Sequence, residues 1–100
     1  MLDFARIDGF DWDDGNRQKS SKKHAVAQLE AEQTFANTPL LVVEDARHSQ
    51  SELRYQALGK SFDERLLFVA FTLRMHGTKI RVISARDMNR KERAIYAQAT

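Results

Sequence analysis

Two strand-like stretches joined by a short turn constrain the fold of this chain most strongly. The first, Leu66–Leu73, is the most apolar run in the sequence, and the second, Lys79–Arg86, is rich in Ile and Val and has no Gly or Pro. Branched and aromatic side chains favour strands, and a strand that is apolar on both faces is usually central in its sheet. Because Met75–Thr78 contains Gly77, the pattern predicts a β-hairpin in the middle of a sheet.

The remaining elements are expected to place strands between helices. Further strands are predicted at Phe4–Trp12, Leu40–Asp45 and Leu53–Gly59, with polar turns at Ala46–Ser51 and Lys60–Glu64. Helices are predicted at Asn16–His24, Val26–Asn37 and Asp87–Ala99. This order is typical of an α+β protein. We expect an antiparallel sheet of four to five strands, packed with two N-terminal helices and one C-terminal helix, in a single domain over residues 1–100.

The three predicted helices differ in how they could be held. The segment 16–24 has no apolar residue, so it lacks the stripe that packs a helix against a core; Asp13 or Asp14 could cap its start. In the second helix, we expect Val26, Leu29 and Phe35 to share the inner face. The last helix begins with a pattern typical of a capping box, Asn89 followed three residues later by Glu92.

Length and composition exclude several classes of protein. One hundred residues form one compact core. No apolar run approaches the roughly 20 residues that span a bilayer, and the first residues lack the pattern of a signal peptide. The absence of cysteine excludes disulfides and thiolate metal sites. We therefore expect a soluble cytoplasmic protein that does not enter a membrane.

The charge of the chain is small but unevenly distributed. The net charge is +2 at pH 7, yet the first fourteen residues hold five Asp and one Arg. Arg17–Lys23 holds four cations and no acid, and Arg74–Arg93 holds seven cations against two acids. Two basic zones favour a polyanionic or acidic partner, although a solvated surface with uneven charge is the simpler interpretation.

The side chains available for chemistry are cations and imidazoles. No phosphate-binding loop, compact metal-ligand set or serine-nucleophile elbow is present, so no cofactor or metal is implied. RNA can be cut without a metal if a base deprotonates the 2′-hydroxyl, an acid protonates the leaving oxygen and cations stabilise the phosphorane. The candidates of this kind are Lys22, Lys23, His24, His48, Arg54, Arg74, Arg81 and Arg86.

The two arginines of the second strand pose a geometric problem. Arg81 and Arg86 are five residues apart, so a regular strand places them on opposite faces. Both could serve one site only if a bulge or the strand end turned one of them. Each also has a structural alternative, because Arg86 could pair with Asp87 or a helix carboxylate and Arg81 could be a surface charge.

The other candidates have structural alternatives as well. His24 could cap the C-terminus of its helix, and His48 could hydrogen-bond within its polar turn. Glu52 and Arg54, two residues apart, could form a surface pair on one strand face. From the residues alone, the sequence therefore indicates a soluble α+β protein with basic zones and leaves its function open.

Short motifs over nearly the whole chain resemble one known family in their order and spacing. These motifs are Phe10–Asp13, Lys23–Val26, Asn37–Val42, Asp45–Gln50, Glu52–Tyr55, Ala57–Lys60, Arg65–Val69, Phe71–Arg74, Ile80–Arg93 and Tyr96. Together they resemble the BrnT toxins of bacterial type II toxin–antitoxin systems. The resemblance implies a RelE-like fold and an endoribonuclease that inhibits translation. It also implies neutralisation by a BrnA-like antitoxin, whose ribbon-helix-helix part would contact operator DNA for the complex.

With this resemblance, the candidate residues acquire expected roles. Phosphate or transition-state binding is expected of Arg86, Arg81 and Arg54. His24 or His48 is expected to carry a proton, with Lys23 beside His24 and Glu52 as a lesser base candidate. RNA binding is expected of Lys19, Lys22, Arg74 and Lys79.

Two positions depart from the family pattern and support an alternative function. Ser20 stands where the family usually has Asn, and Ala25 stands where it has Gly, at a position that favours positive φ. The alternative is a catalytically weak or inactive interaction protein that acts mainly as a co-repressor with its antitoxin. Direct DNA binding by the basic zones is a third possibility.

Overall fold

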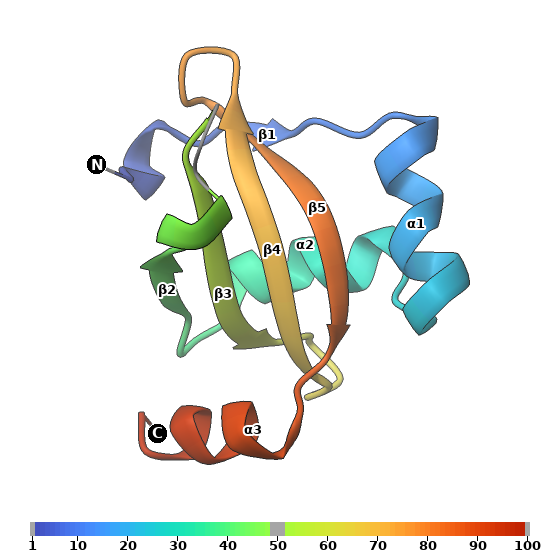
Figure 1. Ribbon diagram of the computed structural model, residues 1–100, viewed down its shortest axis with the longest axis vertical. Coiled ribbons are helices and arrows are strands. Elements are labelled where there is room, and N and C mark those ends of the chain that lie inside the picture. Colours follow the sequence, from blue (N-terminus) through green and yellow to red (C-terminus); the bar gives the residue numbers. More distant parts are fainter. Residues whose placement is uncertain (1, 49–51, 100) are drawn as a thin grey trace.

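A five-stranded sheet forms the centre of the molecule (Figure 1). The computed structural model describes residues 2–48 and 52–99, apart from the side chains of Ser20 and His48. The strands lie in the order β1-β5-β4-β3-β2. Their bounds are β1 Gly9–Phe10, β2 Leu41–Glu44, β3 Arg54–Lys60, β4 Leu66–Arg74 and β5 Lys79–Asp87. The predicted hairpin is confirmed, because β4 and β5 are antiparallel neighbours in the sheet.

The sheet is mixed, which corrects the expectation of a purely antiparallel sheet. Strands β2 to β5 are antiparallel, but β1 pairs in parallel with β5. Two helices follow β1 and carry the chain across to β2 at the far edge, so no tight turn fixes the direction of β1. The predicted strand Phe4–Trp12 is also too long, since a 3-10 turn, η1 Phe4–Arg6, occupies its first part.

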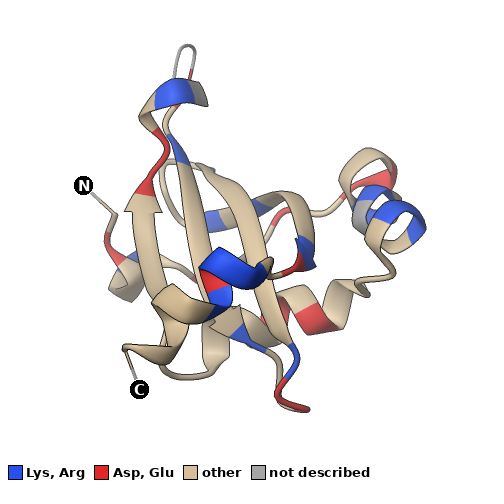
Figure 2. Ribbon diagram, turned by 60° about the horizontal axis from the view of Figure 1, so that its bottom comes forward, with Lys and Arg blue, Asp and Glu red and all other residues tan. Residues whose placement is uncertain are grey.

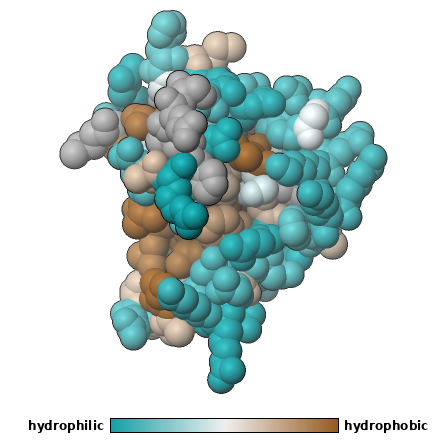
Figure 3. All heavy atoms as spheres, viewed as in Figure 1, coloured by the Kyte–Doolittle hydropathy of each residue, from teal (hydrophilic) through white to brown (hydrophobic). Residues whose placement is uncertain are grey.

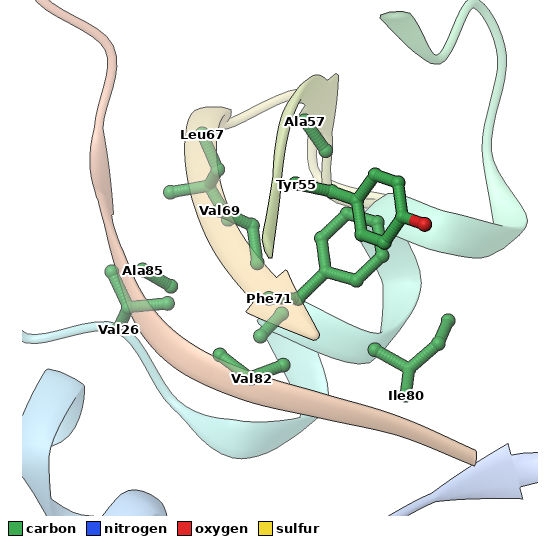
Figure 4. Packing of buried hydrophobic residues seen from close by; sticks show 10 residues of the cluster. Val26, Tyr55, Ala57, Leu67, Val69, Phe71, Ile80, Val82 and Ala85 are labelled. Carbon is green, nitrogen blue, oxygen red and sulfur yellow. The ribbon is translucent and has the colours of Figure 1, made fainter. Parts of the chain in front are cut away.

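One face of the sheet carries the core and is covered by α2, Gln28–Ala36 (Figure 4). Phe35 packs edge-on against Phe71 of β4, with ring centroids 5.0 Å apart. Val26 is buried as expected but lies before the helix, and Leu29 is 62% exposed, so its predicted place on the inner face is wrong. The helix turns Ala31 and, as expected, Phe35 towards the sheet, and it begins two residues later than expected.

Polar contacts hold α1, Asp14–His24, beside β5. The Asp13 carboxylate accepts from the backbone N–H of Asn16 at 3.1 Å, so the expected cap at Asp13 is confirmed. The buried Asn16 side chain donates to the carbonyls of Asp11, at 3.1 Å, and Val82, at 3.0 Å. An amide thus anchors this helix, which carries no apolar stripe. None of the helices in the described part of the chain is long and apolar enough to cross a bilayer.

The last helix, α3 Arg90–Ala97, lies at the end of the sheet where β5 finishes (Figure 1). The predicted capping box is confirmed, since Asn89 accepts from the Glu92 N–H and Glu92 accepts from the Asn89 N–H. The helix begins later than expected because β5 continues to Asp87. Buried Tyr96 donates to the Pro39 carbonyl at 2.6 Å and fixes the helix against the start of β2.

Candidate active site

A bulge in β5 decides which side chains share a face of the sheet. Ala70 of β4 lies opposite Ser84, but the next residue, Phe71, lies opposite Val82. Ile83 is therefore an extra residue on β5. One extra residue inverts the alternation of side chains beyond it, because successive residues of a strand point to opposite faces.

The bulge places Arg81 and Arg86 on the same face. Arg81 lies opposite Thr72 and Arg86 lies opposite Phe68. These two residues of β4 are four apart, so they share a face. Arg54 lies opposite Thr72 on the other side of β4 and shares this face too. We call the face opposite α2 the open face, and its central residues are Arg54, Gln56, Leu58, Phe68, Ala70, Thr72, Arg81, Ser84 and Arg86.

Two more of the predicted residues extend the open face. Arg74 and Lys79 form the cross-strand pair next to Thr72 and Arg81, two residues along each strand. Cations that are scattered through the sequence are thus gathered on one face by strand register.

Two shallow hollows lie on the open face. One of about 220 Å³ is lined by Asp45, Arg54, Gln56, Phe68, Ala70, Ile83 and Ser84. The other, of about 340 Å³, is lined by Leu41, Val43, Gln56, Leu58, Phe68, Asn89, Lys91, Glu92 and Ile95. Because both include Gln56 and Phe68, the hollows adjoin at the middle of the face.

Arg86 is held between an aromatic ring and a carboxylate. Its guanidinium carbon lies 4.1 Å from the centroid of the Phe68 ring. Its Nη1 and Nη2 donate to the two carboxylate oxygens of Glu92 at 2.8 and 2.9 Å. These hydrogen bonds raise the pKa of Arg86 and lower the pKa of Glu92. The expected pairing of Arg86 with a helix carboxylate is therefore observed. The same geometry aligns the guanidinium fork for an anion that accepts two hydrogen bonds.

Arg81 pairs with the acidic segment that precedes α1. Its Nη2 donates to Asp13 at 2.9 Å, and its Nη1 donates to Asp11 at 3.4 Å. The hydrogen bond to Asp13 raises the pKa of Arg81. The pKa of Asp13 is lowered, first by its bond from the Asn16 backbone and then by Arg81. This pairing joins the acidic start of the chain to the open face.

Arg74 and Lys79, which lie next to Arg81 on the open face, also pair with carboxylates. Arg74 donates to Glu52, with which it forms an ion pair. Lys79 lies 2.6 Å from a carboxylate oxygen of Asp8.

Arg65 holds the end of α1 beside the end of β5. Its guanidinium donates to the carbonyls of His24, at 3.3 Å, and Ala25, at 2.9 Å, and to the Asp87 carboxylate at 2.7 Å. It also donates to Glu30 of α2 at 3.1 Å. The pKa of Asp87 is lowered, mainly by Arg65, with a smaller contribution from His24. The backbone of His24 therefore lies at the same end of β5 as Arg86, and Lys23 precedes it in the last turn of α1.

The strand arginines share the open face but do not converge on one point. Arg54 and Arg81 are separated by one strand, about 10 Å between backbones, and Arg86 lies roughly 13 Å further along the sheet. The backbone of His48 belongs to the 3-10 turn Ala46–His48, and its side chain lies outside the described residues. The most compact group consists of Arg86 and Phe68, with His24 at the flank.

Sequence reasoning did not assign a site role to Phe68, Gln56 or Glu92. The spacing contained a signal for Ser84, which lies two residues before Arg86 on the same strand. Glu92 was recognisable only as a capping residue, because its reach to Arg86 depends on how the chain turns between β5 and α3. The place of Phe68 follows from the register of β4 against β5, which the sequence does not specify.

A comparison with protein families adds an independent finding. A family model described as "Ribonuclease toxin, BrnT, of type II toxin-antitoxin system" matches residues 12–92. The matched span runs from the residues just before α1 into α3, and it includes all of the open face on β3, β4 and β5. No curated protein matches the chain.

Proposed function

The chain belongs to the BrnT family of ribonuclease toxins of type II toxin–antitoxin systems, and from this premise we propose that it is an endoribonuclease that cuts RNA without a metal ion and inhibits translation. The observation that carries the proposal is the gathering of Arg54, Arg81 and Arg86 on one face within the matched span. An arginine fork matches phosphate oxygens and keeps its charge at any physiological pH.

In the proposed reaction, Arg86 is the principal ligand of the scissile phosphate. The phosphate displaces the Glu92 carboxylate from the guanidinium fork, while the Phe68 ring keeps the guanidinium in position. A base removes the proton of the 2′-hydroxyl, whose oxygen attacks phosphorus. The 5′-oxygen leaves and takes a proton from an acid, which yields a cyclic phosphate and a free hydroxyl. Arg86 stabilises the charge of the phosphorane.

Proton transfer is assigned to the imidazoles at the flanks. Histidine titrates near neutral pH and can act as base or acid. His24 is the first candidate, because Arg65 fixes its backbone at the same end of β5 as Arg86. His48 is the second candidate. Arg54 and Arg81 bind neighbouring parts of the RNA, together with Arg74, Lys79, Lys19 and Lys22.

The partner belongs to the same proposal. A type II system implies a protein antitoxin, and we assign a BrnA-like ribbon-helix-helix protein to that role. Operator DNA is bound through the antitoxin, and the toxin acts in the cytoplasm as a single domain over residues 1–100.

The proposal is tested with purified protein and single-stranded RNA in the presence of excess EDTA. Cleavage is expected to persist, and Arg86→Ala should lower its rate by roughly 10²–10³-fold, as expected for loss of a transition-state ligand. Arg17→Ala is the matched control, since Arg17 is an exposed arginine on α1 that pairs with Asp14. Equal rates for the wild type and Arg86→Ala would contradict the catalytic role.

One observation favours a second function, a non-catalytic co-repressor. Four cations of the strands each form an ion pair with a carboxylate, namely Arg74, Lys79, Arg81 and Arg86. A face neutralised in this way binds polyanions less strongly than one with exposed cations. Expression without the partner distinguishes the two functions, because growth arrest supports the toxin. Normal growth combined with tight binding of the neighbouring gene's product supports the co-repressor.

A further inference from the structure

An apolar groove lies between α3 and the open face, and most of its lining residues have no part in the proposed catalytic step. Its floor consists of Leu41, Val43, Leu58, Phe68 and Ile95, and we call it the α3 groove. Val43 is 60% and Ile95 is 48% exposed. In Figure 3, hydrophobic side chains gather over β2 and β3, above α3. Uncovered apolar side chains in a hollow are typical of a surface that binds another molecule.

Positive charge accompanies this groove. The start of α3 carries three exposed cations, Arg90, Lys91 and Arg93 (Figure 2). Lys91 lines the groove itself. The one acid of this helix, Glu92, is already engaged by Arg86. The groove therefore offers an apolar floor with Lys91 in its lining, and Arg90 and Arg93 lie on the same helix.

We propose that the α3 groove is the docking site of the partner antitoxin, through an acidic amphipathic segment of that protein. Apolar side chains of the segment fill the hollow of about 340 Å³, and its carboxylates face the cations of α3. This inference rests on the proposed function only in taking a protein antitoxin as the partner. The aliphatic floor favours a protein over RNA, because bases bind by stacking on aromatic rings and Phe68 is the only aromatic residue of this floor.

The position of the groove links docking to inhibition. Phe68 contributes to the groove and also lies beneath the Arg86 guanidinium. Glu92 lines the groove and occupies the Arg86 fork. A segment seated here covers Phe68 and holds α3 in place, so Glu92 cannot leave Arg86. Docking would thus close the proposed phosphate site without contacting its arginine directly.

The test uses the purified product of the neighbouring gene as the probe and measures its affinity for variants of the full chain. Val43→Asp and Ile95→Asp each place a charge in the groove at an exposed position, so the fold should be retained. Each is expected to weaken binding at least tenfold, and the pair at least a hundredfold. Leu29→Asp is the control, because Leu29 is equally exposed but lies on α2, away from the groove.

A second pair of variants tests the charge. Lys91→Glu should weaken binding severalfold and reduce its dependence on salt, whereas Arg17→Glu on α1 should do neither. Circular dichroism melting verifies that every variant folds. RNA cleavage is measured in parallel, and Val43→Asp and Ile95→Asp should leave it unchanged.

These measurements separate the two proposals. Loss of partner binding in the groove variants supports docking even if the wild type cuts no RNA. Undiminished binding by the folded double variant overturns the docking site, as does a wild-type chain that does not bind the probe. Weakened RNA binding with intact partner binding would show that the groove receives RNA and would also overturn the proposal.

Discussion

At the scale of single residues, Glu92 occupies the position that a substrate phosphate would need. Its two carboxylate oxygens accept from both ends of the Arg86 fork, and one of them also accepts from the Asn89 N–H. A phosphate offers the same guanidinium a similar pair of oxygens. Glu92 therefore serves as a structural cap and as an internal competitor of RNA, and these two roles can be separated by mutation.

Glu92→Gln is expected to raise RNA affinity and cleavage severalfold. Glutamine keeps the capping box at this helix position but removes the charge that competes for Arg86. The measurement is single-turnover cleavage of a labelled RNA, with Glu64→Gln as the control because Glu64 pairs with Lys60 at the surface. A decrease in cleavage without a loss of stability would show instead that Glu92 takes part in the reaction.

The same pair predicts a pH dependence of stability. The pKa of folded Glu92 is depressed, chiefly by hydrogen bonds from Arg86. The pair's contribution is therefore fully present above the ordinary pKa of a Glu carboxyl and is lost as the pH falls through the depressed folded value. We expect Glu92→Gln to cost roughly 1 kcal/mol at pH 7 and less at pH 3. Urea unfolding at both pH values tests this, and an equal cost at both would contradict it.

The positive φ of Ala25 agrees with what the family resemblance implies for this position. The resemblance to the BrnT toxins implies Gly at this place, and Ala25 has a φ of +53°, in the region that favours glycine. Ala25→Gly is expected to raise the free energy of unfolding by about 1 kcal/mol, because relief of the left-handed strain exceeds the added entropy of the unfolded chain. Ala31→Gly, in the helical interior of α2, should destabilise by a similar amount. Thermal or urea unfolding of both variants measures the two signs.

At the scale of elements, the sequence predicted which segments are strands and helices but not which face of each element its side chains occupy. The period-2 rule separated Arg81 from Arg86, and only the extra residue Ile83 brings them to one face. A bulge at this point depends on how β4, β5 and α1 pack together, so no local pattern marks it. The inner face of α2 also differs from the prediction, because Val26 is buried in the segment before the helix and is not part of the helix.

The attachment of α1 was beyond sequence reasoning for a different reason. The segment 16–24 lacks the apolar stripe that packs a helix against a core, yet its buried Asn16 bonds to the Val82 carbonyl beside the bulge. A single polar side chain does not change the hydrophobic periodicity from which helix packing is predicted. Its importance appears only when its partner, 66 positions away in the sequence, is known.

Asn16→Ala is therefore expected to loosen α1 selectively. The change removes three side-chain hydrogen bonds, two donated by the amide and one accepted from the Asp13 N–H, and leaves the buried Val82 carbonyl without the amide, at a cost of roughly 2 kcal/mol. Hydrogen exchange should accelerate along α1 and remain slow in β4. Gln18→Ala, at an exposed position of the same helix, should change little. Uniformly faster exchange throughout the protein would show that Asn16 supports the whole fold and not this helix alone.

At the scale of the whole molecule, acids and cations are interleaved more closely than the linear sequence suggests. The acidic start of the chain and the basic zones are separate in the sequence, but Asp8, Asp11 and Asp13 lie against Lys79 and Arg81. The net charge of +2 thus includes cations that are already neutralised in place. Several cations remain without such a partner, and on α1 no carboxylate of the described residues pairs with Lys19, Lys22 or Lys23.

This distribution predicts how RNA binding depends on salt. Each cation that contacts a phosphate of a single strand without a prior partner contributes about 0.7 to the slope of log affinity against log salt. Changing Lys19, Lys22 and Lys23 together to Ala should therefore reduce the slope by about 2. Lys60→Ala should leave it nearly unchanged, since Lys60 is paired with Glu64 at 3.2 Å. Fluorescence anisotropy with a short single-stranded RNA between 50 and 200 mM salt measures both slopes. An unchanged slope in the triple variant would exclude α1 from the RNA interface and leave RNA binding to the open face alone.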